Sequence, residues 1–132
     1  PLLDRFDLHV EVPVQSGEVL MKRDGGGESS TVVRDRVYQA RERQMQRGSG
    51  NAVLSGRELQ THCRVDAAGE AMLSAAMERL GLSARALHRI LRVARTLADL
   101  DGLDHIGNGH LVEALGYRKL DRQQTRNAQV SV

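Results

Sequence analysis

Apolar residues recur three and four positions apart through much of the chain, which is the spacing of amphipathic helices. The pattern is strongest over residues 84–100, which follow the N-cap Ser83 and whose apolar face comprises Leu87, Ile90, Leu91, Ala94, Leu97 and Ala98. A second helix is predicted for residues 67–80, between the N-cap Asp66 and the C-cap Gly81. These two segments are the clearest helices of the chain.

Three further segments have weaker helical patterns. Residues 29–47 are charged on most faces and have one thin apolar stripe, formed by Val33, Val37, Ala40 and Gln44. Residues 55–63 open with a capping box, in which a serine and a glutamate three positions apart satisfy each other's backbone amides. A last helix is expected over residues 108–118, and residues 48–53 are expected to be a loop. The five segments and their short connections predict an all-α helical bundle.

Residues 6–14 have a different pattern, because apolar and polar residues alternate with the period of a half-buried strand. No second strand pattern follows, and a lone strand leaves its backbone donors and acceptors unpaired. Residues 15–27 are predicted to be a loop that ends in a glycine run. We therefore expect residues 1 to about 25 to be extended, and either poorly ordered or docked irregularly on the helices.

Composition narrows the class of protein. The 132 residues are 40% hydrophobic and only 2% aromatic, so the core must consist of aliphatic side chains, which suits helices packed on helices. The net charge of +2 is weak support for a nucleic-acid partner, and a solvated arginine-rich surface explains it more simply. A single cysteine, Cys63, excludes an internal disulfide and fits the cytoplasm, and no apolar run is long enough to span a membrane.

Metal and catalytic motifs are lacking in the sequence. His105 and His110 are the histidines closest in sequence, and their spacing is not typical of a metal site, so none is expected. The glycine run at residues 24–27 lacks the lysine and hydroxyl spacing of a P-loop. No Ser/His/Asp or Cys/His catalytic arrangement stands out either.

Two arginines are candidates for binding phosphate. Arg5 stands between Asp4 and Asp7 at the entrance of the strand-like segment, where a rigid, always-charged fork suits reaching across an interface to a phosphate. Arg85 lies in the first turn of its predicted helix, whose N-terminus already favours anions. A solvent-facing arginine explains Arg85 equally well on spacing alone. Arg89 and Arg92 share its face, and a solvated surface is the simpler interpretation for those two.

These segments resemble a known family. Pro1-Leu2-Leu3-Asp4-Arg5-Phe6-Asp7-Leu8 resembles the segment after sensor 1 in the magnesium chelatase-like branch of AAA+ ATPases. Ser83-Ala84-Arg85-Ala86-Leu87 resembles the sensor 2 motif of their C-terminal lid. The resemblance covers roughly residues 1–122, and three stretches look like the YifB/ComM subfamily in particular: residues 28–44, 89–100 and 111–118.

The resemblance implies a fold and two roles. The fold would be an AAA+ lid-type helical bundle at residues 28–119, preceded by the end of the AAA+ core and a linker at residues 1–27 and followed by a polar tail at residues 120–132. Arg5 would be the arginine finger, acting in trans on the nucleotide of a neighbouring subunit. Arg85 would be the sensor 2 arginine, contacting the phosphates of its own subunit's nucleotide.

The same resemblance implies partners for the parent protein. That parent would be an ATPase using ATP and Mg, built as a homo-oligomeric ring with six subunits expected. In the YifB/ComM subfamily it would act as a DNA helicase promoting branch migration during natural transformation. The chain itself lacks Walker A and Walker B motifs, so it is expected to hold no cofactor and not to be catalytic alone. Its partners would be its own AAA+ core, neighbouring subunits and, through the parent, DNA, but no membrane.

Two other functions stay open. One is the equivalent part of a magnesium chelatase subunit, although the pattern of residues 28–44 favours the YifB/ComM subfamily. The other is a non-enzymatic basic helical module that binds nucleic acid directly. Its support is a set of arginines on one long helix, interrupted by Asp35 and Glu42: Arg34, Arg36, Arg41, Arg43 and Arg47.

Overall fold

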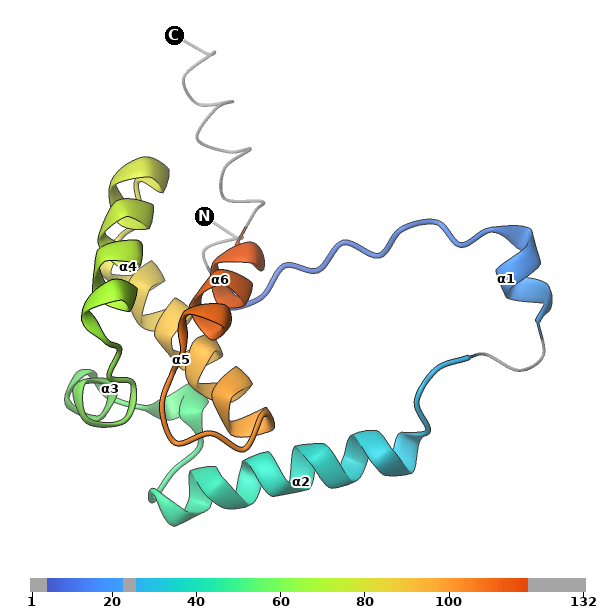
Figure 1. Ribbon diagram of the computed structural model, residues 1–132, viewed down its shortest axis with the longest axis horizontal. Helices are drawn as coiled ribbons and strands as arrows, with labels where there is room; N and C mark the ends of the chain where they lie inside the picture. Colours follow the sequence, from blue (N-terminus) through green and yellow to red (C-terminus); the bar gives the residue numbers. More distant parts are fainter. Residues whose placement is uncertain (1–4, 23–25, 119–132) are drawn as a thin grey trace, which may run out of the picture.

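Helices account for all the regular secondary structure in the computed structural model, which describes residues 5–22 and 26–118 (Figure 1). No strand occurs within those ranges, so the all-α prediction is confirmed. The elements, in chain order, are α1 (Gly17–Met21), α2 (Ser30–Gln46), the 3-10 helix η2 (Asn51–Val53), α3 (Gly56–His62), α4 (Ala67–Leu80), α5 (Ala84–Leu100) and α6 (Asn108–Gly116).

Helix α5 is the centre of the bundle. It packs against α2, η2, α3 and α6, while α4 packs against α6 (Figure 1). Its apolar face supplies Ile90, Ala94 and Ala98 to a continuous aliphatic core, and each of these is at most 2% exposed. The core is completed from the other elements by Leu54, Leu59, Cys63, Leu73, Ile106, Leu111 and Ala114.

Side-chain caps set the ends of the helices where the sequence predicted them. The hydroxyl of Ser83 accepts a hydrogen bond from the amide of Ala86 at 3.1 Å, and Asp66 accepts one from the amide of Gly69 at 2.7 Å. Gly81 ends α4 in the left-handed conformation, with φ 61°. The predicted bounds of α4 and α5 are therefore confirmed, and the other three predicted helices are present with ends that differ by one or two residues.

Two short helices were not predicted. Helix α1 lies in the segment expected to be a loop, and η2 lies in the loop expected at residues 48–53. The hydroxyl of Ser16 caps α1 by accepting a hydrogen bond from the amide of Val19 at 3.4 Å. The negative charge of Glu18, in the first turn, stabilises the helix by its interaction with the positive end of the helix dipole. None of the residues of α1 is buried, so local capping rather than packing accounts for this turn.

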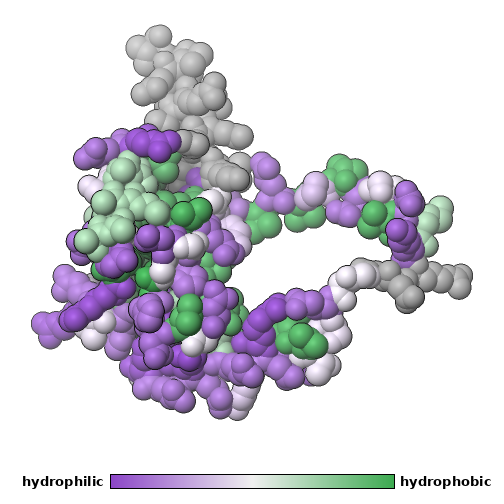
Figure 2. Space-filling view, in the orientation of Figure 1, coloured by the Kyte–Doolittle hydropathy of each residue, from purple (hydrophilic) through white to green (hydrophobic). Residues whose placement is uncertain are grey.

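Residues 6–14 are extended but join no sheet, as expected for a lone strand-like segment. Their side chains become more exposed away from the bundle, from 48% at Leu8 to 82% at Val12 and 100% at Val14. Apolar side chains are visible along this segment in the space-filling view (Figure 2). Expectations for residues 1–4 and 120–132 concern positions outside the described ranges.

Helix α2 contacts the bundle with its second half only. Of the predicted apolar stripe, Ala40 and Gln44 are buried, but Val33 and Val37 are 37% and 48% exposed. The thin stripe therefore makes its contact with the core through its second half only. The reason is visible in Figure 1, where the first half of α2 runs beyond the other helices.

The carboxylate of Asp99 is the centre of a buried polar cluster that fixes α2 on α5. Its side chain has no exposed area, and its two oxygens accept from Arg47 at 2.8 and 2.5 Å. The side-chain amide of Asn51 in η2 donates to the same carboxylate at 2.8 Å. Arg95, one helical turn earlier in α5 and 1% exposed, lies 3.1 Å from it. Two cations and one amide therefore share a single buried anion.

Further hydrogen bonds connect this cluster to the neighbouring loop and to α2. Arg95 donates to the carbonyl oxygens of Leu103 and Asp104, at 2.5 and 2.8 Å, and so fixes the loop between α5 and α6. The amide nitrogen of Asn51 donates to the side-chain oxygen of Gln44 in α2 at 3.1 Å. A second, exposed pair links the same elements, since Arg43 of α2 contacts the carboxylate of Asp104 at 2.8 Å.

We expect Asp99→Ala to lower the free energy of unfolding by about 3–5 kcal/mol, because it leaves Arg47 and Arg95 buried without their carboxylate. Urea denaturation followed by circular dichroism measures this, and Asp99→Asn serves if the alanine variant does not fold. The matched control is Asp104→Ala, whose carboxylate is 90% exposed and which should leave the midpoint nearly unchanged. Equal destabilisation by both alanine variants would contradict the assignment of Asp99 as the organising anion.

Candidate functional site

Arg85 lies where the sequence placed it, in the first turn of α5. Its side chain is exposed, and it makes no hydrogen bond or ion pair with any residue that the structure describes. The guanidinium is therefore available to an external anion. The helix N-terminus next to it adds a favourable field for that anion, since α5 has no acidic residue in its first turn.

Arg5 is the first residue that the structure describes, and it is also exposed. The segment that follows it is fixed to the ends of α5 and α6 by polar contacts. The carbonyl oxygen of Phe6 accepts from Nη1 of Arg89 at 3.3 Å and from Nη1 of Arg118 at 3.4 Å. The amide of His9 donates to the carbonyl oxygen of Tyr117 at 2.9 Å. The irregular docking that the sequence predicted thus occurs at residues 6–9.

Arg89 connects the two candidate arginines. Its Nε lies 3.4 Å from a carboxylate oxygen of Asp7, and its side chain is only 15% exposed. It stands one helical turn after Arg85, and it also contacts Phe6, the residue that follows Arg5. The structure therefore brings both predicted site residues to one region of the molecule, through a residue for which the sequence favoured a solvated position.

Arg92 also departs from the expected solvated face. It donates to the carbonyl oxygen of Leu54 at 2.7 Å, which fixes the residue between η2 and α3 on α5. The expectation of an outward-facing cluster of Arg85, Arg89 and Arg92 is thus wrong for the last two. Helical periodicity places them opposite the apolar core, but the N-terminal segment and the residue after η2 cover that face.

Two of the hollows formed by the described residues flank α5. One, of about 390 Å³, lies between the N-terminal segment and α5, and its apolar lining includes Leu8, Val10, Val93, Leu97 and Leu100. The other, of about 740 Å³, is an open groove among α3, α4 and α5 with a floor of aliphatic side chains. Cys63, the thiol that lines the second groove, is buried.

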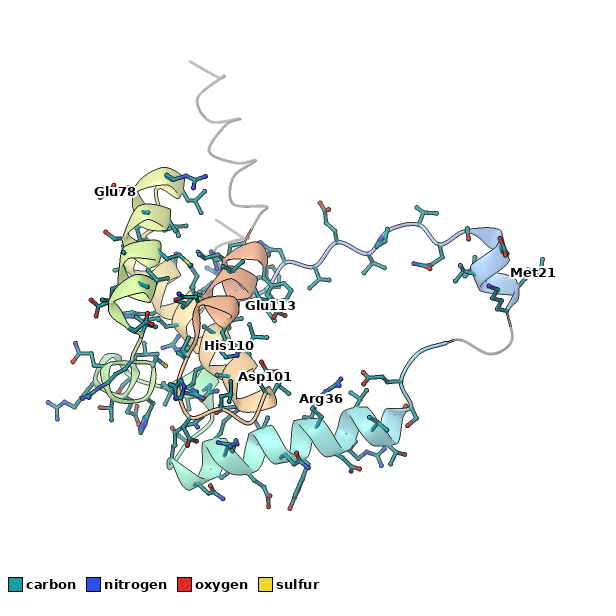
Figure 3. All side chains as sticks on the ribbon, viewed as in Figure 1. Met21, Arg36, Glu78, Asp101, His110 and Glu113 are labelled. Atoms are coloured by element: carbon teal, nitrogen blue, oxygen red, sulfur yellow. The ribbon has the colours of Figure 1, made fainter. Side chains whose placement is uncertain are left out.

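Titratable groups offer little chemistry in this structure. Burial raises the pKa of Cys63 to about 11, so the thiol is protonated at neutral pH. His110 accepts from the amide of Gly107 at 2.9 Å and lies 2.9 Å from Asp101, and Figure 3 shows that His110 and Asp101 lie next to each other.

Among the described residues, no three His, Cys, Asp or Glu side chains are arranged to share a metal ion. None of the helices in those ranges has the length and apolar character to cross a membrane.

The arginines of α2 are mostly engaged within the domain. Arg36, labelled in Figure 3, pairs with Glu28 at 2.9 Å, and this hydrogen bond lowers the pKa of that carboxyl group. Arg43 pairs with Asp104 and Arg47 with Asp99, so three of the five arginines have acidic partners. Only Arg34 and Arg41 remain as exposed arginines of α2 without a described partner.

Taken together, a central amphipathic helix surrounded by short capped helices, with an exposed arginine in its first turn, defines a helical lid-type domain. Residues 27–118 match the family model for the C-terminal domain of magnesium chelatase, subunit ChlI. The chain belongs to this family.

Curated relatives of the chain support this family assignment. The chain is 46% identical over 123 residues to competence protein ComM of Haemophilus influenzae, and it is 45% identical over the same length to YifB of Escherichia coli. Each match covers 92% of this chain and 24% of the relative. An uncharacterized Mycobacterium tuberculosis protein is 39% identical over 124 residues, which are 90% of this chain and 24% of that protein. The chain therefore spans about a quarter of the length of these relatives.

Direct DNA binding by this domain is expected to be weak, because most arginines of α2 are already paired. We expect a dissociation constant for duplex DNA no lower than about 10⁻⁵ M at physiological salt, measured by fluorescence anisotropy over a salt series. The double variant Arg34→Ala/Arg41→Ala should change it only slightly. Submicromolar binding with a steep salt dependence, lost in that variant, would instead favour an independent nucleic-acid module.

Proposed function

We propose that this domain is the C-terminal lid of an AAA+ ATPase, in which Arg85 acts as sensor 2 and Arg5 as the arginine finger. The observation that supports this most directly is the state of Arg85. It is an exposed guanidinium without a described partner, at the N-terminus of the central helix of a magnesium chelatase-type C-terminal domain. An always-charged fork in that position suits bidentate contact with a phosphate.

The role of Arg85 follows from its helix. The exposed first turn of α5 would lie against the phosphates of ATP held by the AAA+ core of the same subunit, with Mg bound by that core. When the guanidinium engages the phosphates, it would pull the lid over the nucleotide and exclude water from the site. ATP would supply the phosphoryl group that reacts. This chain would contribute the positive charge of Arg85 and the closing of the lid over the nucleotide.

Arg5 would serve a different nucleotide. It would reach across the subunit interface and stabilise the negative charge that develops on the transferring phosphoryl group of the neighbouring subunit. Its exposed side chain, at the end of the N-terminal segment that docks on the bundle, supports a role toward another subunit. The active unit would therefore be a homo-oligomeric ring, with six subunits expected.

For the parent protein we propose a cytoplasmic, DNA-directed branch-migration motor in natural transformation. The 46% identity to a competence protein supports this proposal. The second candidate is an ATPase subunit of magnesium chelatase, which the description of the matching family favours. Stimulation of ATP turnover by branched DNA in the full-length protein would favour the first, whereas stimulation only by the other chelatase subunits would favour the second.

We expect Arg5→Ala and Arg85→Ala to reduce ATP turnover by the full-length protein strongly, by about a hundredfold or more for Arg5 and about tenfold or more for Arg85. Both side chains are exposed, so circular dichroism and the thermal midpoint should not change. Arg79→Ala, an exposed arginine of α4, is the matched control and should turn over ATP at the wild-type rate.

A mixing experiment separates action in trans from action within one subunit. Subunits carrying Arg5→Ala should recover part of their turnover when mixed with subunits disabled in the P-loop, because each kind supplies what the other lacks. Subunits carrying Arg85→Ala should recover less, since Arg85 and the P-loop would serve the same nucleotide. Wild-type turnover in both single variants would refute the assignment of the two arginines.

A further inference from the structure

We propose that Arg89 and Arg118 are positioning residues that fix the segment bearing Arg5 onto the helix bearing Arg85. Through this clamp, the engagement of one nucleotide by the lid would set the position of the arginine finger that serves the next. The consequence for turnover rests on the function proposed above for Arg5 and Arg85. The clamp itself rests on contacts within this chain.

The clamp is defined by four polar contacts. Arg89 and Arg118 both donate to the carbonyl oxygen of Phe6, at 3.3 and 3.4 Å. Arg89 also lies 3.4 Å from the carboxylate of Asp7, and the amide of His9 donates to a carbonyl oxygen at the end of α6 at 2.9 Å. The segment is thus held at three residues near Arg5, by Arg89 of α5 and by the two residues that follow α6.

The two arginines of the clamp are largely buried, whereas Phe6 and Asp7 are about half exposed. Arg118 is only 3% exposed, and the side chain of Arg89 is 15% exposed. Removing a guanidinium from water to this extent costs free energy unless its N–H groups donate hydrogen bonds to acceptors in the protein. The carbonyl oxygen of Phe6 is an acceptor that both arginines share, so it contributes to satisfying their buried donors.

Apolar packing does not explain the docking equally well. The side chains that would supply it are largely exposed, at 51% for Phe6, 48% for Leu8 and 66% for Val10. Hydrogen bonds to the backbone therefore position the segment. Hydrogen bonds depend on direction and distance, whereas apolar contacts have no preferred direction. A change in the orientation of α5 is therefore expected to move the segment with it.

The connection between the two functional arginines is short and stiff. Arg85 and Arg89 are separated by one turn of α5, a rise of about 6 Å along a rigid helix. Arg5 is bonded directly to Phe6, so their Cα atoms are about 3.8 Å apart. A rotation of α5 on closing over a phosphate would carry Arg89 and, through Phe6, displace Arg5. This provides a contiguous route between two nucleotide sites in a ring.

The clamp can be tested in the 132-residue chain by hydrogen exchange. Arg89→Ala and Arg118→Lys should remove protection at the amide of His9, whereas amides in the middle of α5 should keep theirs. The control Arg79→Ala should retain protection at His9. Unchanged protection of His9 in both clamp variants would overturn the proposal, whatever the activity of the parent.

The functional consequence can be tested in the full-length protein. Arg89→Ala should lower kcat about tenfold or more with the KM for ATP unchanged, because the finger is displaced while the subunit's own nucleotide is still bound. Cooperativity in ATP should fall, and Arg89→Lys should recover part of kcat. The double variant Arg5→Ala/Arg89→Ala should be no slower than Arg5→Ala alone, since both changes remove the same finger.

The outcomes separate this inference from the proposed function. Suppose that Arg5→Ala and Arg85→Ala turn over ATP slowly but Arg89→Ala has wild-type kcat and cooperativity. The proposed coupling of the two nucleotide sites through the clamp (the relay) is then wrong, while the proposed roles of Arg5 and Arg85 stand. A rise in KM alone for Arg89→Ala would also overturn the relay, because it would place Arg89 in binding of the subunit's own nucleotide. Wild-type turnover in Arg5→Ala and Arg85→Ala would refute the function, while hydrogen exchange at His9 would still decide whether the clamp exists.

Discussion

The buried carboxylate of Asp99 is the constraint on which the arrangement of this domain depends. Helix α2 buries only Ala40 and Gln44, which is too little apolar surface to define its position on the bundle. Its docking is instead specified by Arg47, which reaches the buried anion beside Arg95. A buried ion pair is often no more stabilising than well-packed apolar residues. We infer that its value here is specificity, because another register of α2 would leave charges buried and unpaired.

This constraint matters because one helix carries both the organising anion and the arginines Arg85 and Arg89 of the candidate site. Along α5, an apolar face forms the core, Arg95 and Asp99 fix α2 and the following loop, and the first two turns present Arg85 and Arg89. These faces are set by helical periodicity, so they cannot rotate independently. Fixing Asp99 therefore also fixes the direction of the exposed arginine at the other end of the helix, four turns away.

The sequence was sufficient for the features that local rules decide. The bounds of α4 and α5 followed from periodicity and from the caps Asp66 and Ser83, and the absence of a sheet followed from the lack of a second strand. The family was also recognisable from short motifs. What could not be predicted depended on contacts between distant segments. Arg95 and Asp99 are charged residues one turn apart, which a pattern analysis assigns to the surface.

Arg89 illustrates the same limit at the site itself. Helical periodicity correctly placed Arg89 opposite the core, and a solvated position was therefore expected for it. Its actual environment comes from Phe6 and Asp7, more than 80 residues earlier in the chain, and no local signal marks that contact. The exposure of Arg85 and Arg5 agreed with the sequence because nothing in the described chain covers them. The roles of these two arginines remain proposals that the geometry supports.

The polar nature of the clamp is itself informative about the proposed motor. A hydrogen bond that involves a charged group contributes about 1.5–3 kcal/mol, less where water competes. One such bond is therefore of the same order as the free energy of allosteric coupling between sites, about 1–3 kcal/mol. A segment held by extensive apolar burial would move only when the domain unfolds. A segment held by Arg89 and Arg118 would be able to shift when the domain closes, which the proposed role of Arg5 as an arginine finger would require.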